Sequence, residues 1–168
     1  MNDFLAIHGV RLRDDLRPGD LGAVIRLHGV LYAEEHGFDA RFEASVAEGL
    51  AKFVLELDPD RSRLWVAERG GEVVGSIAIV GDAAGTPQLR WFLVDPYCRS
   101  MGVGRRMLAE SLAFARASGA RSVFLWTLND LDAAIRLYQL NGFRLTEEVA
   151  HETWGTPVTE QRFDLDLG

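Results

Sequence analysis

The sequence predicts an α/β domain in which a mixed sheet carries helices on its faces. Short β-rich runs and segments of helical periodicity follow one another in the order β, α, α, β, β, β, α, β, α, β, β. Gly70-Gly71 separates two of the β-rich runs and supplies the positive φ that a tight antiparallel hairpin needs. Residues 93–108 join a strand to a helix through a turn that contains glycine. With no internal repeat, low-complexity segment or linker, we expect residues 1–168 to form one domain.

The composition is that of an ordinary globular protein. Of 168 residues 48% are hydrophobic and 26% are charged, and the mean hydropathy is −0.01. No apolar run approaches the roughly 18 residues that a membrane span needs, and the N-terminus has no basic-then-apolar signal pattern. We therefore expect a cytoplasmic protein with no membrane partner.

Charge and cysteine content exclude several kinds of partner. The net charge of −7 and the isoelectric point near 5.1 argue against a nucleic acid, which requires a basic surface, and favour cationic or neutral substrates. The single cysteine, Cys98, excludes an internal disulfide and a zinc site of several thiolates, and we assign it no role. No cluster of His, Cys and carboxylates has metal-ligand spacing, so we predict no metal.

The first third of the chain predicts a strand followed by two helices. Apolar and charged residues alternate over Val10–Leu16, which indicates a strand. Asp20 is placed to cap a helix that runs to about His36. A second helix is expected to begin near Asp39, and Pro59 closes it.

The middle of the chain predicts three strands in succession. Leu64–Glu68 and Val73–Val80 flank the glycine pair and form an antiparallel hairpin. After a loop over Gly81–Pro87, the apolar run Gln88–Val94 forms the central strand. Asp95-Pro96 stops this strand, because proline lacks the ladder N–H.

The last third of the chain predicts a helix, a strand, a short helix and an antiparallel strand pair. The expected elements are a helix from near Gly102 to Gly119, a strand over Ser122–Thr127, a helix capped by Asn129-Asp130 and ended by Asn141-Gly142, and strands over Phe143–Val149 and Glu160–Leu167.

The turn after the central strand is suited to an anion. Each of two glycines in a first helical turn costs roughly 0.5–1 kcal/mol relative to Ala, which suggests that something approaches the backbone closely. Free N–H groups at a helix N-terminus attract negative charge, and Arg99, Arg105 and Arg106 add positive charge nearby. A diphosphate is the expected ligand, and an ordinary glycine-containing connection is the alternative. The sequence lacks Gly-Lys-Ser/Thr of a P-loop and the third glycine of a dinucleotide fingerprint.

The combination of motifs in the second half resembles the GNAT superfamily of N-acetyltransferases. It consists of Arg99-x-x-Gly102-x-Gly104, then Asn129, then Leu137-Tyr138-x-x-x-Gly142-Phe143. The resemblance implies a mixed, mostly antiparallel sheet with a V-shaped opening and helices on both faces. A closer likeness is to the acetyltransferase half of bacterial fusions with MarR-type regulators, carried by His28-Gly-Val-Leu-Tyr-Ala33, Gly37-Phe-Asp39, Phe42-Glu-Ala44, Trp65-Val-Ala-Glu68 and Leu125-Trp-Thr127.

The resemblance implies acetyl-CoA as cofactor, bound in the opening. Main-chain groups of Leu93 and Val94 would bind the pantetheine arm and polarise the thioester. Asn129 would contact the pantetheine or adenine side. The pyrophosphate would be held beside Arg99 by the N–H groups of Ser100, Met101, Gly102, Val103, Gly104 and Arg105.

The implied activity is transfer of acetyl to a primary amine of a small molecule or protein, by direct attack through a tetrahedral intermediate. Tyr138 matches the tyrosine that protonates the departing thiolate, and a phenol with a pKa near 10 keeps its proton at neutral pH. The alternative for Tyr138 is a packing role. The alternative function is a non-catalytic acyl-CoA-binding sensor or interaction module. The oligomeric state stays open, a homodimer included.

No general base is evident in the sequence. Gln88 occupies the position where some family members carry a glutamate, and an amide cannot accept the proton. Glu34, Glu35 and His36 are substrate-side candidates, with a solvated helix end as the alternative and a water relay as another route. An acceptor pocket or the core would accommodate Trp91, Phe92, Trp126 and Trp154, and His28 is expected to be structural.

Overall fold

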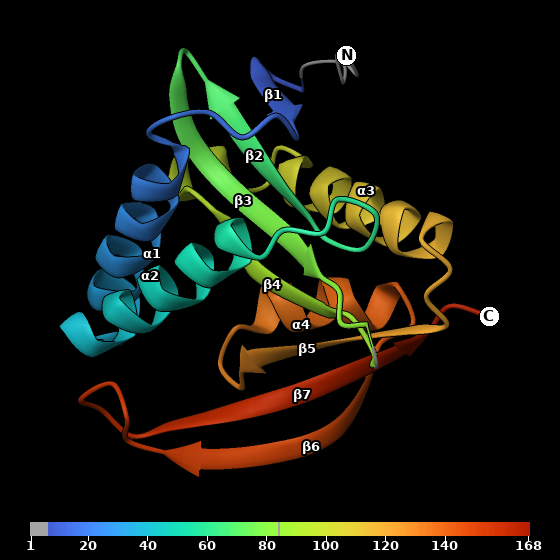
Figure 1. Cartoon of the computed structure of the whole chain (residues 1–168). Coiled ribbons are helices and arrows are strands. Elements are labelled where there is room, and N and C mark those ends of the chain that lie inside the picture. The colour runs from blue at the N-terminus through green and yellow to red at the C-terminus, as the bar shows by residue number, and fades with distance from the viewer. Residues whose placement is uncertain (1–6, 84) are drawn as a thin grey trace.

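A single mixed sheet forms the centre of the protein (Figure 1). The computed structural model describes residues 7–83 and 85–168. In this part of the chain seven strands pair in the order β1-β2-β3-β4-β5-β7-β6, and only β4 and β5 are parallel neighbours. The strands are β1 Val10–Arg13, β2 Arg63–Arg69, β3 Glu72–Val80, β4 Gln88–Val94, β5 Ser122–Leu128, β6 Arg144–His151 and β7 Val158–Asp166. The predicted α/β class with a mixed, mostly antiparallel sheet is confirmed.

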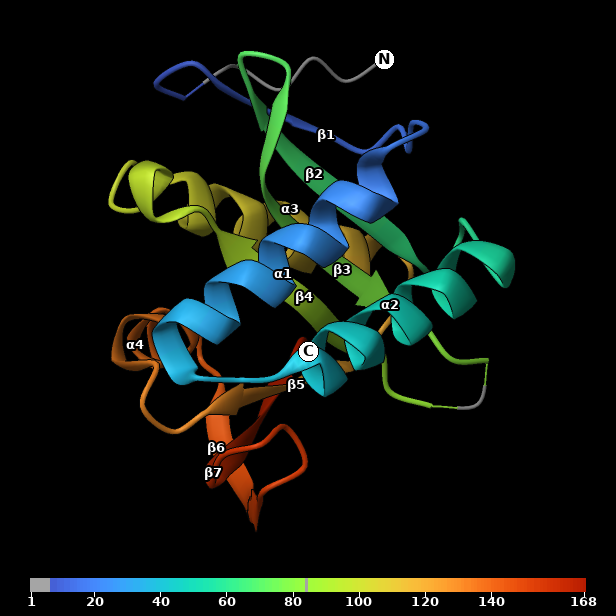
Figure 2. The ribbon, with the colours of Figure 1, turned by 90° about the vertical axis from the view of Figure 1, so that its left-hand side faces the viewer.

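Helices cover both faces of the sheet. Figure 2 looks onto α1 (Asp20–His36) and α2 (Ala40–Leu55), which lie in front of it. The opposite face carries α3 (Val103–Ala117) and α4 (Asp132–Leu140), and a short 3-10 helix, Pro96–Cys98, precedes α3. Two hydrophobic cores result, one between the sheet and α3 and α4, the other between the sheet and α1 and α2. No described helix has the length and apolar character to cross a membrane.

Most predicted elements are present, but several ends differ. β1 stops at Arg13 instead of Leu16, and α2 stops at Leu55, before Pro59. The predicted start of the second helix near Asp39 is confirmed, and the Asp39 carboxylate caps α2 by accepting the Arg41 N–H at 3.0 Å. Residue 84, in the loop predicted over Gly81–Pro87, lies outside the described residues. So do residues 1–6, the N-terminal segment in which we looked for a signal pattern.

Two predicted helix caps are wrong. α1 begins after Gly19, whose φ of 94° is left-handed, and Asp20 is the first helical residue. The Asp20 carboxylate is instead engaged by arginine, as described below. α4 begins after Leu131 and has no side-chain cap, so Asn129 and Asp130 precede the helix without capping it.

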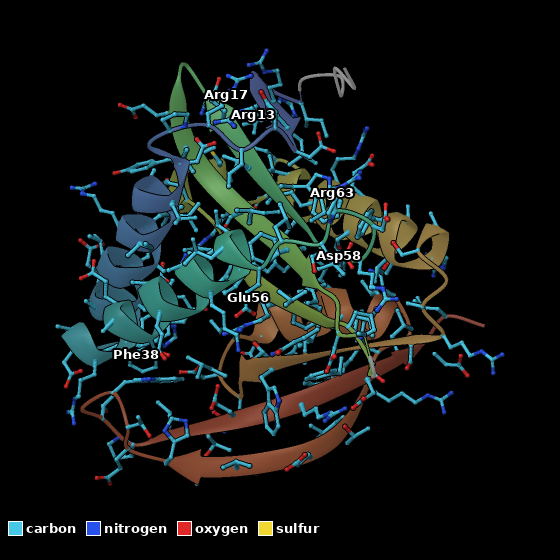
Figure 3. All side chains as sticks on the ribbon, in the orientation of Figure 1. Arg13, Arg17, Phe38, Glu56, Asp58 and Arg63 are labelled. Atoms are coloured by element: carbon cyan, nitrogen blue, oxygen red, sulfur yellow. The ribbon has the colours of Figure 1, made fainter. Side chains whose placement is uncertain are left out.

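A buried ion pair joins β1 to the start of α1. Arg13 and Asp20 are 7% and 5% exposed, and their side chains form two parallel hydrogen bonds of 2.8 and 2.7 Å. Asp20 also accepts the Arg17 N–H at 2.7 Å, and Arg13 Nε donates to Glu68 on β2 at 3.0 Å. Figure 3 labels Arg13 and Arg17 beside these strands. Burial tends to raise the pKa of Asp20, but the hydrogen bonds from Arg13 and Arg17 outweigh it and hold the pKa below its ordinary value.

The parallel pair β4 and β5 is joined only where the strands begin. Gln88 pairs with Phe124, and the Phe124 N–H donates to the Pro87 carbonyl at 3.2 Å. Further along, the described strands share no register pair, while β4 stays paired with β3 as far as Val94. The sheet therefore opens between the carboxyl ends of β4 and β5, which agrees with the expected V shape.

We predict that Asp20→Asn lowers the free energy of unfolding by roughly 3 kcal/mol at pH 7, because the buried Arg13 then loses one of its two close anionic partners and keeps only Glu68. Since the folded pKa of Asp20 is lowered, the contribution of the pair is present above the unfolded value of about 3.9 and is lost as the pH falls through the folded pKa. Urea unfolding at pH 7 and pH 3 measures both effects. Asp15→Asn, at an exposed carboxylate, is the control and should change little. An Asp20 variant as stable as wild type at pH 7 would contradict this account.

Candidate active site

A cleft of about 1040 Å³ lies where β4 and β5 separate. On one side it is lined by the N-terminal turn of α3 and by α4, and on the other by α1 and α2. It therefore runs through the opening of the sheet and connects its two faces. We call the part beside α3 and α4 the cofactor side, and the part beneath α1 and α2 the acceptor side.

The turn before α3 presents free N–H groups to the cofactor side. Ser100 and Gly102 have left-handed φ values of 64° and 80°. In the described chain the N–H groups from Ser100 through Arg105 have no protein acceptor, and the Arg106 N–H is the first to bond, to the Gly102 carbonyl at 3.0 Å. Such a concave row of N–H groups at a helix N-terminus is an anion site. Ser100, Gly102, Gly104 and Arg105 line the cleft, whereas Val103 packs in the core and Met101 against it.

The three arginines predicted around this turn have different surroundings. Arg105 is exposed and lines the cleft, together with Arg136 of α4, which the sequence reasoning missed. Arg106 bonds to Glu110 at 2.8 Å along its own helix. Arg99 bonds through Nε to the Val94 carbonyl and through Nη1 to Glu35, each at 2.9 Å. Arg99 therefore links the end of β4 to α1.

A bulge turns the main chain of β4 within the cleft. Ser76 pairs with Leu93 but Ala78 pairs with Arg90, so β4 has one residue more than β3 over this stretch. Trp91 has a left-handed φ of 49°, and its carbonyl accepts the buried Ser76 hydroxyl at 2.7 Å. A bulky residue at positive φ is strained and persists where the surroundings fix it. The residue pattern of β4 did not predict this bulge.

Two close approaches fix the end of β4. A Cβ on Gly75 of β3 would lie 2.7 Å from the Leu93 carbonyl oxygen, so only glycine fits there. A Cβ on Gly104 would meet the Phe92 ring at 3.4 Å, which brings α3 close to β4. Leu93 and Val94, predicted to face the cofactor, line the cleft.

Tyr138 lies on α4 with its ring in the core and its edge at the cleft. It is 4% exposed, and its ring centroid is 5.7 Å from that of Phe143 and 6.1 Å from that of Phe92. The hydroxyl has no protein hydrogen bond among the described residues, and no described buried polar side-chain atom lacks a partner, so the hydroxyl reaches the cleft surface. Burial, and secondarily the nearby Tyr32, raises the pKa of Tyr138 above its ordinary value. Tyr138 therefore lines the cleft, and its catalytic role stays a prediction.

Tyr32 of α1 faces the same cleft, and the sequence reasoning missed it. Burial raises the pKa of Tyr32 to about 12, and nearby Glu35, Glu160 and Asp130 add to the shift while Arg99 opposes it. These charges come from α1, β7, the β5–α4 loop and the turn before α3. Tyr32 therefore marks where segments distant in sequence meet at the mouth of the acceptor side.

A second cavity of about 690 Å³ adjoins the main cleft and is lined by His36, Asp130 and His151, while Glu160, the partner of His151, lines the main cleft. His36 Nδ1 lies 3.6 Å from Asp130, and His151 Nε2 lies 2.8 Å from Glu160. Since the Thr153 N–H donates to His151 Nδ1 at 3.2 Å, Nε2 carries the proton and donates to Glu160. Asn129, predicted to contact the cofactor, lines this second cavity and not the main cleft.

The remaining substrate-side predictions divide between the cleft and solvent. Glu35 and His36 line both cavities, whereas Glu34 is exposed and lines neither. Gln88, Trp91, Phe92, Trp126 and Trp154 all line the main cleft, and Trp91 belongs to the core as well. His28 is 3% exposed and its Nδ1 donates to the Val24 carbonyl at 2.9 Å. Burial lowers the pKa of His28 to about 4, so the ring is neutral at pH 7; the residue also lines the cleft, and its structural role stays a prediction.

The described residues offer no cluster of side chains suited to a metal ion. In residues 7–83 and 85–168 there is no group of three or more His, Cys, Asp or Glu side chains that could hold a metal ion. Cys98 is buried, and its sulfur lies 3.9 Å from Arg69 Nη1. The prediction that the protein uses no metal stays a prediction.

Known proteins share this sequence pattern. The chain is 31% identical over 116 residues to the Probable N-acetyltransferase camello of Xenopus laevis, covering 68% of this chain and 52% of that protein. It is 36% identical over 113 residues to N-acetyltransferase 8 of Mus musculus, covering 63% of this chain and 50% of that protein. The chain thus spans about half the length of these two relatives.

Solved structures share the fold. An N-acetyltransferase from Staphylococcus aureus Mu50 matches with a TM-score of 0.75 at 16% identity, over 95% of this chain and 99% of that one. A putative acetyltransferase from Salmonella typhimurium, solved with its cofactor acetyl-CoA, matches with a TM-score of 0.71 at 20% identity, over 95% of each chain.

The family assignment rests on the sequence. Residues 27–143 match the acetyltransferase (GNAT) family, and this range holds β4, the turn before α3 and Tyr138. Because the match extends over more than half of the chain, the protein belongs to the acetyltransferase (GNAT) family.

Proposed function

We propose that the protein transfers the acetyl group of acetyl-CoA to a primary amine of a small molecule or protein. The observation that carries this proposal is one continuous cleft that joins an anion-binding turn to a tyrosine hydroxyl without a protein partner. A diphosphate fits the N–H groups from Ser100 through Arg105, with Arg105 and Arg136 nearby to balance its charge. Main-chain groups of Leu93 and Val94 then lie beside the pantetheine arm.

The contribution of Arg99 differs from the sequence expectation. Its guanidinium is occupied by the Val94 carbonyl and by Glu35, so we assign it to holding the end of β4 and the mouth of the acceptor side. Asn129 lines the second cavity and not the main cleft, so its contact with the cofactor stays a prediction. The remaining turn residues keep the cofactor role first given to them.

Acetyl-CoA supplies an activated thioester, and the chain must manage the protons. An amine loses a proton when it becomes an amide, and the departing sulfur gains one. We assign the donor role to Tyr138, because its raised pKa keeps the phenol protonated at neutral pH. A phenol is a weaker acid than a thiol, so we expect Tyr138 to recover its proton from the attacking amine in the same step. Water at the acceptor side is the simplest carrier of that proton, since Gln88 cannot accept it.

Two alternatives from the sequence remain as hypotheses. A non-catalytic acyl-CoA-binding module would bind acetyl-CoA in the same cleft and release no thiol with any amine. The finer likeness to the acetyltransferase half of MarR-type fusions has no support in the relatives described above. It stays a hypothesis about ancestry and adds nothing to the proposed chemistry.

We predict that Tyr138→Phe lowers kcat by about 10²–10⁴-fold and leaves the affinity for acetyl-CoA close to wild type, because only the hydroxyl is lost. Steady-state thiol release and acetyl-CoA titration measure the two effects. Tyr97→Phe, at a ring that is 87% exposed, is the matched control and should keep full activity. An unchanged kcat for Tyr138→Phe, measured where chemistry limits the rate, would make Tyr138 a packing residue.

We predict that Gly102→Val weakens acetyl-CoA binding far more than Gly19→Val does. Gly102 and Gly19 both precede a helix with left-handed φ values of 80° and 94°, and a Cβ on either meets no atom within 4 Å. The two substitutions should therefore cause similar losses of stability, about 1–2 kcal/mol or somewhat more for a branched side chain. Only the change at Gly102 disturbs the N–H groups of the turn. Titration of both variants with acetyl-CoA tests this, and equal affinities would refute the role of the turn.

A further inference from the structure

Arg90 of β4 is a cation that the chemistry described above does not use. It pairs with Ala78 of β3 and faces the α1 and α2 side of the sheet, where it lines the cleft. Its guanidinium carbon lies 4.5 Å from the centroid of the Trp91 ring. A Cβ on Gly49 of α2 would lie 3.2 Å from Arg90 Nη2, so the guanidinium runs beneath α2. Arg90 therefore occupies the inner part of the acceptor side.

No anion of the described chain balances this charge. Arg90 makes no ion pair and no side-chain hydrogen bond among the described residues, and burial lowers its pKa. Stacking on an indole compensates part of the desolvation, at roughly 0.5–2 kcal/mol. A guanidinium has five N–H donors, and a ring contact satisfies none of them. A partly buried arginine of this kind is suited to an anionic group that arrives with a ligand.

The carboxylates of the acceptor side differ from Arg90 in this respect. Glu35 bonds to Arg99 at 2.9 Å, Asp130 lies 3.6 Å from His36, and Glu160 bonds to His151 at 2.8 Å. Each of these carboxylates thus faces a basic side chain of the protein, whereas Arg90 faces no acidic side chain among the described residues. The charged group of the acceptor side that has no polar partner among the described residues is therefore the guanidinium beneath α2, which suits an acidic group on the acceptor.

The surroundings of Arg90 suit a small molecule. Trp126 and Gln88 from the sheet, Ser45 from α2 and Tyr32 from α1 line the same cleft as Arg90. Arg90 lies three positions before Leu93, but their partners on β3, Ala78 and Ser76, are two positions apart, so the separation along the bulged strand is roughly 7 Å. An amine at the thioester could therefore reach Arg90 with its other end.

We propose that the acceptor is a small amine that also carries a carboxylate, and that Arg90 binds this carboxylate. The inference rests on the proposed acetyltransferase function. The planar guanidinium fork matches a carboxylate through two parallel hydrogen bonds, and the Trp91 ring fixes the plane of the fork.

The test compares amines that differ only at the far end. Thiol release from acetyl-CoA is measured for phenylalanine, methionine, β-alanine and γ-aminobutyrate, each against its own carboxamide, and for the diamines putrescine and cadaverine. For the best pair we expect wild type to prefer the carboxylate by roughly 10- to 100-fold in kcat/KM, as for a hydrogen bond to a charged group. Arg90→Gln should lose this preference, so that the ratio of kcat/KM for the carboxylate to that for its carboxamide falls toward one. Arg90→Lys should retain part of it.

Arg26→Gln is the matched control, because Arg26 is exposed on α1 and outside the cleft, and it removes the same charge. The control should keep the wild-type preference. Equal rates for carboxylate and carboxamide in wild type, faster turnover of the diamines, or a preference that survives Arg90→Gln would each overturn the proposal.

A binding measurement separates this proposal from the proposed function. Titration of each carboxylate and its carboxamide into the protein saturated with coenzyme A needs no turnover. Tighter binding of a carboxylate, lost in Arg90→Gln and kept in Arg26→Gln, supports the Arg90 site even if no amine is acetylated. Absence of turnover with every amine would count against the acetyltransferase function, and absence of any Arg90-dependent carboxylate binding would count against the site.

Discussion

The separation of β4 from β5 is the constraint on which the rest of the structure depends. Two parallel strands that share one register pair leave the facing main-chain groups beyond Gln88 without a strand partner. Buried main-chain groups of this kind need hydrogen bonds from another source. The bulge at Trp91, fixed by Ser76, turns these groups into the opening, and Gly75 allows β3 to follow the bend. An extended ligand between the strands would supply the missing bonds, and the cleft has that shape.

The opening also connects two chemically different halves. The cofactor side offers N–H groups and two exposed arginines, which suits a diphosphate. The acceptor side is aromatic and carries carboxylates that are already paired, with one arginine that is not. Arg99 touches both halves, since it bonds to the Val94 carbonyl on β4 and to Glu35 on α1. A change in the position of β4 on cofactor binding would therefore be transmitted to α1 through this side chain.

The sequence predicted local features well and features that depend on tertiary contacts poorly. Helical periodicity, strand alternation and the glycine turn before α3 depend on nearby residues, and these elements appear where they were expected. Asp20 was predicted as a helix cap because of its residue type, but its carboxylate is bound by the buried Arg13 of β1. The sequence did not predict the bulge at Trp91, nor that Tyr32 and Arg90 would line the cleft. Each of these features depends on partners that only the folded sheet brings together. Tyr138 could be singled out because its motif lies in a short stretch of sequence. The rings that surround it come from distant parts of the chain and could not be predicted.

The central claim is that acetyl-CoA lies between the separated ends of β4 and β5, with its diphosphate on the turn before α3. A crystal structure of the protein with bound coenzyme A tests this most directly. The account predicts diphosphate oxygens within hydrogen-bond distance of the N–H groups from Ser100 through Arg105, and the thiol end beside the Tyr138 hydroxyl. Coenzyme A bound outside the opening, or with its thiol end turned away from Tyr138, would contradict the account.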